Sequence, residues 1–165
     1  MSVELSRPPA ADRRNRLIGV ATFACGSFWR VEQAFGEVPG VLETTAGYTG
    51  GTVPNPSYER VATGATGHVE AVRVEFEPAR VSYEELLELF WRQHDPTRPR
   101  LGRRSRYRSV IFVHSPEQER AARESIAAQG TVLGWRVLTE VCRAPLFYRA
   151  EERHQRFLER RAPAG

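Results

Sequence analysis

The sequence predicts an α+β fold with a ferredoxin-like split βαβ core, extended by an added C-terminal helix, strand and helix. Three observations predict it. Strand-like and helix-like apolar segments follow one another in the order strand, helix, strand, strand, helix, strand. Two Ser-x-x-Glu or Ser-x-x-Gln segments mark helix starts, and 165 residues with 41% hydrophobic content suit a single domain. We therefore expect residues 17–165 to form one domain, preceded by a flexible polar tail at residues 1–16.

The first strand, helix and strand of this pattern lie at the start of the domain. Leu17–Phe23 is a largely apolar run that predicts a buried strand. Phe28–Phe35 predicts a short helix that ends at Gly36, because glycine is common just beyond the last helical residue. Val41–Tyr48 predicts a second strand, which leads into a glycine-containing turn.

A third strand is predicted at Val69–Phe76, where apolar residues alternate with others. One face carries valine, alanine, arginine and glutamate, and the other face is the expected core face. The core-facing residues are Glu70, Val72, Val74 and Phe76. Glu70 therefore shares a face with three large apolar side chains.

The second half of the chain begins with a capping box at Ser82, and a second capping box follows at Ser115 with proline at the first helical position. The elements predicted here are a helix from Ser82 to about His94, a strand at Arg108–Val113, a helix from Ser115 to about Gln129, a strand at Val137–Val141 and a terminal helix at Ala150–Arg161.

Composition excludes several functional classes. No segment approaches the roughly 18 consecutive apolar residues of a membrane span, and the N-terminus lacks the apolar part of a secretory signal. We therefore expect a cytoplasmic protein without membrane contact. All 24 basic residues are arginine and the net charge is +4. The aromatic residues lie mostly in apolar runs rather than between the arginines, so we expect no nucleic-acid partner.

An ordered set of short motifs spans residues 21 to about 160. The motifs are Ala21-Thr22-Phe23-Ala24 with Phe28-Trp29, Gly47-Tyr48-Thr49-Gly50-Gly51, Asn55-Pro56-Ser57-Tyr58, Gly64-Ala65-Thr66-Gly67-His68-Val69-Glu70-Ala71-Val72, His94-Asp95-Pro96-Thr97, Tyr107-Arg108-Ser109, Phe147-Tyr148 and His154-Gln155. In order and approximate spacing, this set resembles the methionine sulfoxide reductase A family.

The resemblance implies the fold and chemistry of that family. There, a cysteine thiolate at a helix N-terminus attacks the sulfoxide sulfur, while a glutamate and two tyrosines hydrogen-bond and protonate the oxygen. A phenylalanine and a tryptophan hold the S-methyl group. The cysteine leaves as a sulfenic acid, a second cysteine condenses with it, and thioredoxin reduces the disulfide. No histidine and cysteine spacing suggests zinc, and we expect neither a metal nor another cofactor.

The acid and the aromatic groups of the family match residues of this chain. The glutamate matches Glu70, which the strand pattern also places on the core face, where burial raises a carboxyl pKa toward that of a general acid. A structural carboxyl bonded to a tyrosine is the alternative. The aromatic residues at substrate-contacting positions are Phe28, Trp29, Tyr58 and Tyr107, with Tyr48 expected nearby. Tyr58 and Tyr107 are expected to act with Glu70, and a purely structural aromatic core is the alternative.

The nucleophile position is occupied by Ser27, and a hydroxyl cannot replace the thiol, because accepting the sulfoxide oxygen would create an O–O bond. Ser27 can instead cap the following helix and hydrogen-bond a ligand. Cys25, near the same helix N-terminus, is a candidate nucleophile, and a small buried residue is the alternative. Cys142 is a candidate redox partner of Cys25 if the two strands that carry them end at the same side of the sheet. Two cysteines do not suggest a disulfide scaffold.

Cations replace other groups near the expected pocket. Arg30 follows the tryptophan where the family has glycine, and the segment 98–106 carries arginines and no acid. We expect Arg30, with one or more of Arg103, Arg104 and Arg106, to bind an anionic substrate through guanidinium forks. Solvated surface charge is the alternative.

These observations lead to three interpretations of function. The first is an enzyme of this family repurposed for a different reaction on a small, anionic, sulfur-containing substrate, with Glu70 as acid or base and Cys25 as nucleophile. The second is a peptide methionine (S)-sulfoxide reductase whose catalytic cysteine has shifted. The third is a non-catalytic module that binds a small molecule. Thioredoxin or another thiol reductant is the expected protein partner of an enzyme.

Overall fold

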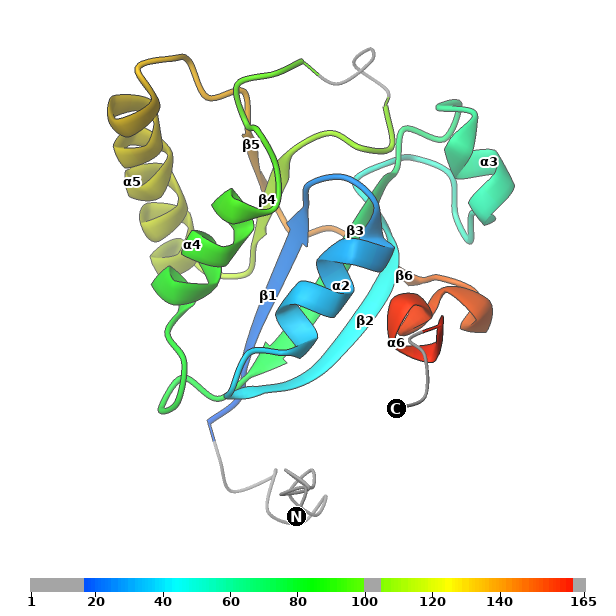
Figure 1. The fold of residues 1–165 in the computed structure, drawn as a ribbon. Coiled ribbons are helices and arrows are strands. Elements are labelled where there is room, and N and C mark those ends of the chain that lie inside the picture. Colours follow the sequence, from blue (N-terminus) through cyan, green and yellow to red (C-terminus); the bar gives the residue numbers. More distant parts are fainter. Residues whose placement is uncertain (1–16, 100–104, 162–165) are drawn as a thin grey trace.

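The structure is a computed structural model that describes residues 17–99 and 105–161. A six-stranded sheet forms one layer, and the helices α2 (Phe28–Gly36), α4 (Tyr83–Arg92) and α5 (Pro116–Leu133) cover one of its faces (Figure 1). The predicted tail at residues 1–16, and Arg103 and Arg104, lie outside the described residues. Among the described helices, none has the length and apolar character needed to cross a membrane.

The strands and helices of the core follow the predicted order with small shifts at their ends. They are β1 (Gly19–Ala24), α2 (Phe28–Gly36), β2 (Val41–Thr49), α3 (Tyr58–Ala62), β3 (Val69–Phe76), α4 (Tyr83–Arg92), β4 (Val110–Val113), α5 (Pro116–Leu133), β5 (Glu140–Arg143), β6 (Tyr148–Arg149), the 3-10 turn η1 (Glu152–His154) and α6 (Phe157–Arg161).

The strand order confirms the predicted fold class. The order is β5-β4-β1-β3-β2-β6, and its middle four strands have the arrangement of a split βαβ core. Those four strands are antiparallel to their neighbours, whereas β5 joins β4 in parallel and β6 pairs with β2. The added strands therefore extend the core sheet at both edges.

The main core lies between the sheet and the helices α2, α4 and α5. Apolar side chains of β1 and β3 meet α2 and α4 there, including Phe23, whose ring stacks on Phe35 at a centroid distance of 4.9 Å. On β3, Val72, Val74 and Phe76 belong to this core, as predicted. A smaller cluster, built from the other faces of β1, β3 and β4, lies beneath residues 144–147.

The C-terminal third departs most from the sequence prediction. The helix α5 is four residues longer than expected and ends at Gly134, which has the left-handed φ of 66° that glycine adopts without strain. The predicted helix at Ala150–Arg161 is wrong: η1 and the short α6 replace it, and Arg156 between them has a positive φ of 50°. The strand expected at Val137–Val141 lies a few residues later, and the sequence prediction missed α3 and β6.

Candidate active site

A buried carboxylate meets the N-terminal end of α2. Glu70 lies near the start of β3 with only 2% of its surface exposed. Its Oε1 accepts a hydrogen bond of 3.2 Å from the backbone N–H of Phe28, the first residue of α2. The first N–H groups of a helix have no partner within the helix, so this carboxylate satisfies one of them from a neighbouring strand.

The second carboxylate oxygen faces Arg106. The Nε of Arg106 is 3.4 Å from Oε2 of Glu70, an ion-pair distance, and within the described part of the chain Oε2 has no partner in hydrogen-bond geometry. The backbone N–H of Glu70 also donates to the carbonyl oxygen of Arg106 at 2.9 Å. This backbone bond fixes residues 106 and 107 beside the acid.

The burial of Glu70 controls its proton affinity. Burial raises the pKa of this carboxyl to about 7, because removal of water disfavours the charged form, while the Phe28 N–H and the Arg106 guanidinium both lower it. A carboxyl with this pKa is partly protonated near neutral pH. It can therefore donate a proton, which is what a general acid requires.

Arg106 also joins the two tyrosines to the acid. Its guanidinium carbon lies 5.3 Å from the centroid of the Tyr58 ring and 4.6 Å from that of Tyr107. Tyr58 begins α3, whereas Tyr107 precedes β4, so three separate segments converge at one place. Burial, and next the charge of Glu70, raise the pKa of Tyr107, which keeps its hydroxyl protonated.

An aromatic clasp adjoins this acid. We use this term for the rings of Phe28, Trp29, Tyr48, Tyr58 and His154. Phe28 lies 5.7 Å from Tyr48 and 6.4 Å from Tyr58, and Trp29 lies 6.4 Å from Tyr58, measured between ring centroids. The structure thus brings together the predicted acid and the predicted aromatic residues.

Two residues of the site were not assigned to it from sequence. No role in the site was assigned to His154 from sequence, yet it stacks on Tyr58 at 4.4 Å, and its Nδ1 accepts a 3.0 Å hydrogen bond from the indole of Trp29. Glu151 accepts hydrogen bonds from the Tyr48 hydroxyl at 2.8 Å and from the Tyr58 backbone N–H at 3.0 Å. The His154-Gln155 motif carried a signal for this segment, whereas nothing in the sequence pattern singled out Glu151.

The residues at the nucleophile position have unexpected environments. Ser27 is the N-cap of α2, but its side chain makes no capping hydrogen bond. Cys25 follows β1 directly, is 0% exposed and packs in the main core. Gly26 between them has a φ of 112°, in the region that favours glycine. The Ser27 hydroxyl therefore lies at the start of α2, whereas the Cys25 thiol is buried in the core below that helix start.

Cys142 is poorly placed to act as a redox partner of Cys25. In the sheet, Cys142 pairs with Phe112, which in turn pairs with Thr22, so two strand spacings separate β5 from β1. The Cα atoms of the two cysteines are about 14 Å apart, from strand spacing and rise. Cys142 shares the face of Thr22, whereas Cys25 packs in the core on the opposite face. A direct disulfide would require backbone movement, because bridged Cα atoms lie within about 7 Å.

The arginines predicted to bind an anion do not lie together in the described part of the structure. Arg30 is exposed, and its guanidinium folds back along α2, where a Cβ atom on Gly26 would lie 3.3 Å from Nη2. Arg106 pairs with Glu70 instead. Arg103 and Arg104 fall outside the described residues, so their position stays a prediction.

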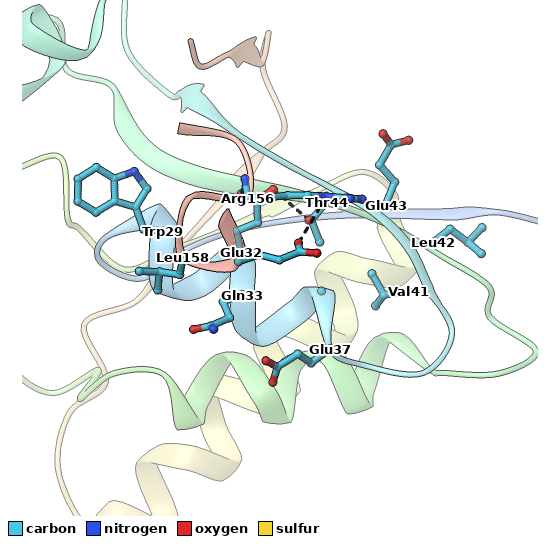
Figure 2. A pocket seen from close by; sticks show the side chains of 12 residues that line it. Trp29, Glu32, Gln33, Glu37, Val41, Leu42, Glu43, Thr44, Arg156 and Leu158 are labelled. Carbon is cyan, nitrogen blue, oxygen red and sulfur yellow. Dashed lines mark hydrogen bonds and ion pairs between the residues drawn. The ribbon is translucent and has the colours of Figure 1, made fainter. Parts of the chain in front are cut away.

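A cavity of about 420 Å³ opens beside the clasp, between α2, β2 and α6 (Figure 2). The Glu32 carboxylate in the cavity wall accepts two hydrogen bonds, from the Thr44 hydroxyl at 3.0 Å and from the Arg156 backbone N–H at 2.7 Å. The cavity includes Trp29 but not Glu70. Glu70 therefore lies outside this cavity. Within residues 17–99 and 105–161, no three His, Cys, Asp or Glu side chains are grouped as metal ligands would be.

The described residues form a ferredoxin-like domain in which a buried acid, two tyrosines and an aromatic clasp lie together, an arrangement that can place a proton donor beside an apolar surface. Residues 19–164 match the family model described as peptide methionine sulfoxide reductase. The chain belongs to this family of oxidoreductases.

Individual relatives agree with this assignment. A peptide methionine sulfoxide reductase MsrA of Methanoculleus marisnigri is 51% identical over 86% of this chain and 89% of its own length. The chloroplastic reductase A4 of Arabidopsis thaliana is 47% identical over 88% of this chain, which spans only 57% of that relative.

Solved structures share the fold. Reduced Mxr1 from Saccharomyces cerevisiae has a TM-score of 0.81 at 27% identity and covers 97% of this chain and 91% of its own. Mxr1 in complex with Trx2 has a TM-score of 0.63 at 23% identity, over 93% of this chain and 91% of its own, and shows the fold alone.

The comparisons overturn one interpretation. A family member repurposed for a different reaction on a small anionic substrate was the leading prediction, and it is wrong. Relatives that are 47–51% identical over most of this chain carry the name of the reductase itself. The findings favour the reductase activity named in the second interpretation.

Proposed function

We propose that this protein reduces methionine (S)-sulfoxide. The observation that carries the proposal is Glu70, a buried acid with a pKa of about 7 beside the N-terminus of α2. Such an acid can protonate the sulfoxide oxygen, with Tyr58 and Tyr107 as further hydrogen-bond donors. Phe28 and Trp29 would hold the S-methyl group against apolar surface.

Cys25 is the thiol that we assign to the reaction. Its thiolate attacks the sulfoxide sulfur, the oxygen passes to the cysteine, and the products are methionine and Cys25 sulfenic acid. The substrate sulfur gains two electrons and the cysteine sulfur loses two. The positive end of the α2 dipole favours an anionic sulfur here. Because Cys25 is 0% exposed, the reaction requires residues 25–27 to open.

An external dithiol would complete the cycle. The sulfenic acid condenses with one thiol of the reductant and releases water, and the second thiol displaces the mixed disulfide to regenerate Cys25. We assign this role to thioredoxin or a similar protein, because Cys142 lies on the other face of the sheet. Mxr1, whose reduced form is 27% identical to this chain, has also been solved in complex with Trx2, and this supports a partner of this kind.

The test is reduction of N-acetylmethionine (S)-sulfoxide amide with dithiothreitol, followed by product chromatography. We expect turnover by the wild type and by Cys142→Ser, because Cys142 takes no part. We expect none by Cys25→Ser, since no other thiol lies near the acid. A Cys25→Ser variant that reduces the sulfoxide as fast as the wild type would refute the assignment.

One observation favours a second candidate function. Cys25 is buried in the core and Ser27 occupies the helix start, so the acid and the aromatic clasp could bind methionine sulfoxide without reducing it. This candidate predicts binding by the wild type without product. It also predicts that Ser27→Cys gains reductase activity, because the new thiol would stand at the helix start.

A further inference from the structure

Arg106 places a positive charge at the centre of the site, and the proposed reaction gives this charge no role. Arg106 is the side chain that contacts Glu70, Tyr58 and Tyr107 together. It is 22% exposed, which leaves it mostly buried yet open to a ligand. Its backbone carbonyl accepts the N–H of Glu70 at 2.9 Å, so the arginine and the acid keep a fixed relation.

We propose that Arg106 is an oxygen-binding residue of this site, whose guanidinium donates a hydrogen bond to the sulfoxide oxygen while it stays paired with Glu70. This inference rests on the proposed substrate. A guanidinium carries five N–H donors in a rigid plane, more than the contact with one carboxylate oxygen uses. The guanidinium lies against Glu70 and over both tyrosine rings, so a ligand oxygen that reaches these groups also comes within reach of it.

The chemistry of the ligand suits this donor. The S–O bond of a sulfoxide is strongly polar, with negative charge on the oxygen, and the sulfide that remains after reduction lacks that oxygen. As a thiolate attacks the sulfur, more negative charge collects on the oxygen. A fixed cation in a mostly buried site stabilises such developing charge more than water does. Arg106 would therefore favour sulfoxide over sulfide and assist the proton transfer from Glu70.

The proposal predicts a selective loss in Arg106→Gln, which keeps a neutral N–H donor but shortens the side chain and removes the charge. Binding of N-acetylmethionine (S)-sulfoxide amide, followed by NMR titration, should weaken roughly tenfold or more, the size expected for a hydrogen bond to a charged group. Binding of the matching sulfide should stay unchanged. Arg106→Lys should lose less, because the cation remains.

Two controls separate the role of Arg106 from a structural one. Arg60→Gln removes an exposed arginine of α3 and should leave both affinities unchanged. In Arg106→Gln, the pKa of Glu70, measured by carboxyl ¹³C NMR, should rise because a lowering charge is gone. Equal loss of sulfoxide and sulfide binding, or unchanged sulfoxide binding, would overturn the proposal.

The same titration distinguishes this inference from the proposed reductase activity. A wild-type protein that binds sulfoxide in an Arg106-dependent way but forms no product supports the inference and contradicts the activity. A wild-type protein that does not bind sulfoxide contradicts both.

Discussion

Glu70 is subject to opposing influences. Burial favours its protonated form, whereas the Phe28 N–H and the Arg106 guanidinium favour the carboxylate. Burial dominates, because the pKa is raised from 4.5 to about 7. The residue is thus an acid that loses its proton within the physiological range, and both activity and stability should depend on that proton.

We expect Glu70→Gln to lower the reductase rate by roughly 10²- to 10⁴-fold, the usual contribution of a general acid. The wild-type rate should fall as the pH rises through about 7, where the carboxyl loses its proton. This fall in rate, the basic limb of the pH–rate profile, should be absent from the residual activity of the variant. An unchanged limb in the pH–rate profile of Glu70→Gln would show that another group titrates.

The same proton has a consequence for stability. The folded protein holds it more tightly than the unfolded chain, because the folded pKa is raised. The contribution of Glu70 is therefore fully present below pH 4.5 and is lost as the pH rises toward about 7. Urea unfolding of Glu70→Gln should accordingly show the amide variant gaining stability relative to the wild type between these pH values.

At the scale of elements, the three helix starts α2, α4 and α5 differ in how they are capped. The Ser82 hydroxyl accepts the Glu85 N–H at 3.0 Å, and Ser115 does the same for Gln118 at 3.1 Å. Ser27 holds the equivalent position on α2 without such a bond, and Glu70 takes the Phe28 N–H instead. The start of α2 is therefore stabilised from the sheet, which leaves the Ser27 hydroxyl uncommitted to capping.

This difference predicts unequal costs for two matched substitutions. Ser82→Ala should lower the free energy of unfolding by about 1 kcal/mol, the usual value of a capping serine. Ser27→Ala should cost much less, because no capping bond is lost. Urea denaturation of both variants measures the difference. Equal losses would mean that Ser27 is an ordinary cap.

At the scale of the whole molecule, local patterns predicted the four core strands and the helices α2 and α4. Alternation on β3 also placed Glu70 among Val72, Val74 and Phe76. These elements were predictable because a helix or strand that is buried on one face has apolar residues at regular spacing in the sequence.

The C-terminal segment was not predictable in this way. Residues 150–161 have helical composition, but long-range bonds determine their path. The Gln155 side chain accepts the N–H of Ala46 and donates to its carbonyl oxygen, both at 2.9 Å, and Glu32 accepts the N–H of Arg156. Contacts with β2 and α2 therefore override local preference, and they bring His154 and Glu151 to the site.

Cysteine placement shows the same limit. The sequence gives no distance between Cys25 and Cys142, whereas strand pairing places them two strands apart and on opposite faces. The cycle that we propose therefore has one protein thiol, and its oxidised form must wait for an external reductant.

The most direct test of this account is a single turnover without reductant. The full chain is mixed with excess methionine (S)-sulfoxide and a sulfenic-acid trap, and then analysed by peptide mass spectrometry. We predict methionine equal in amount to the protein and the trap attached to Cys25. Absence of methionine, or a trap attached to Cys142 alone, would contradict the assignment of Cys25 as the reducing thiol.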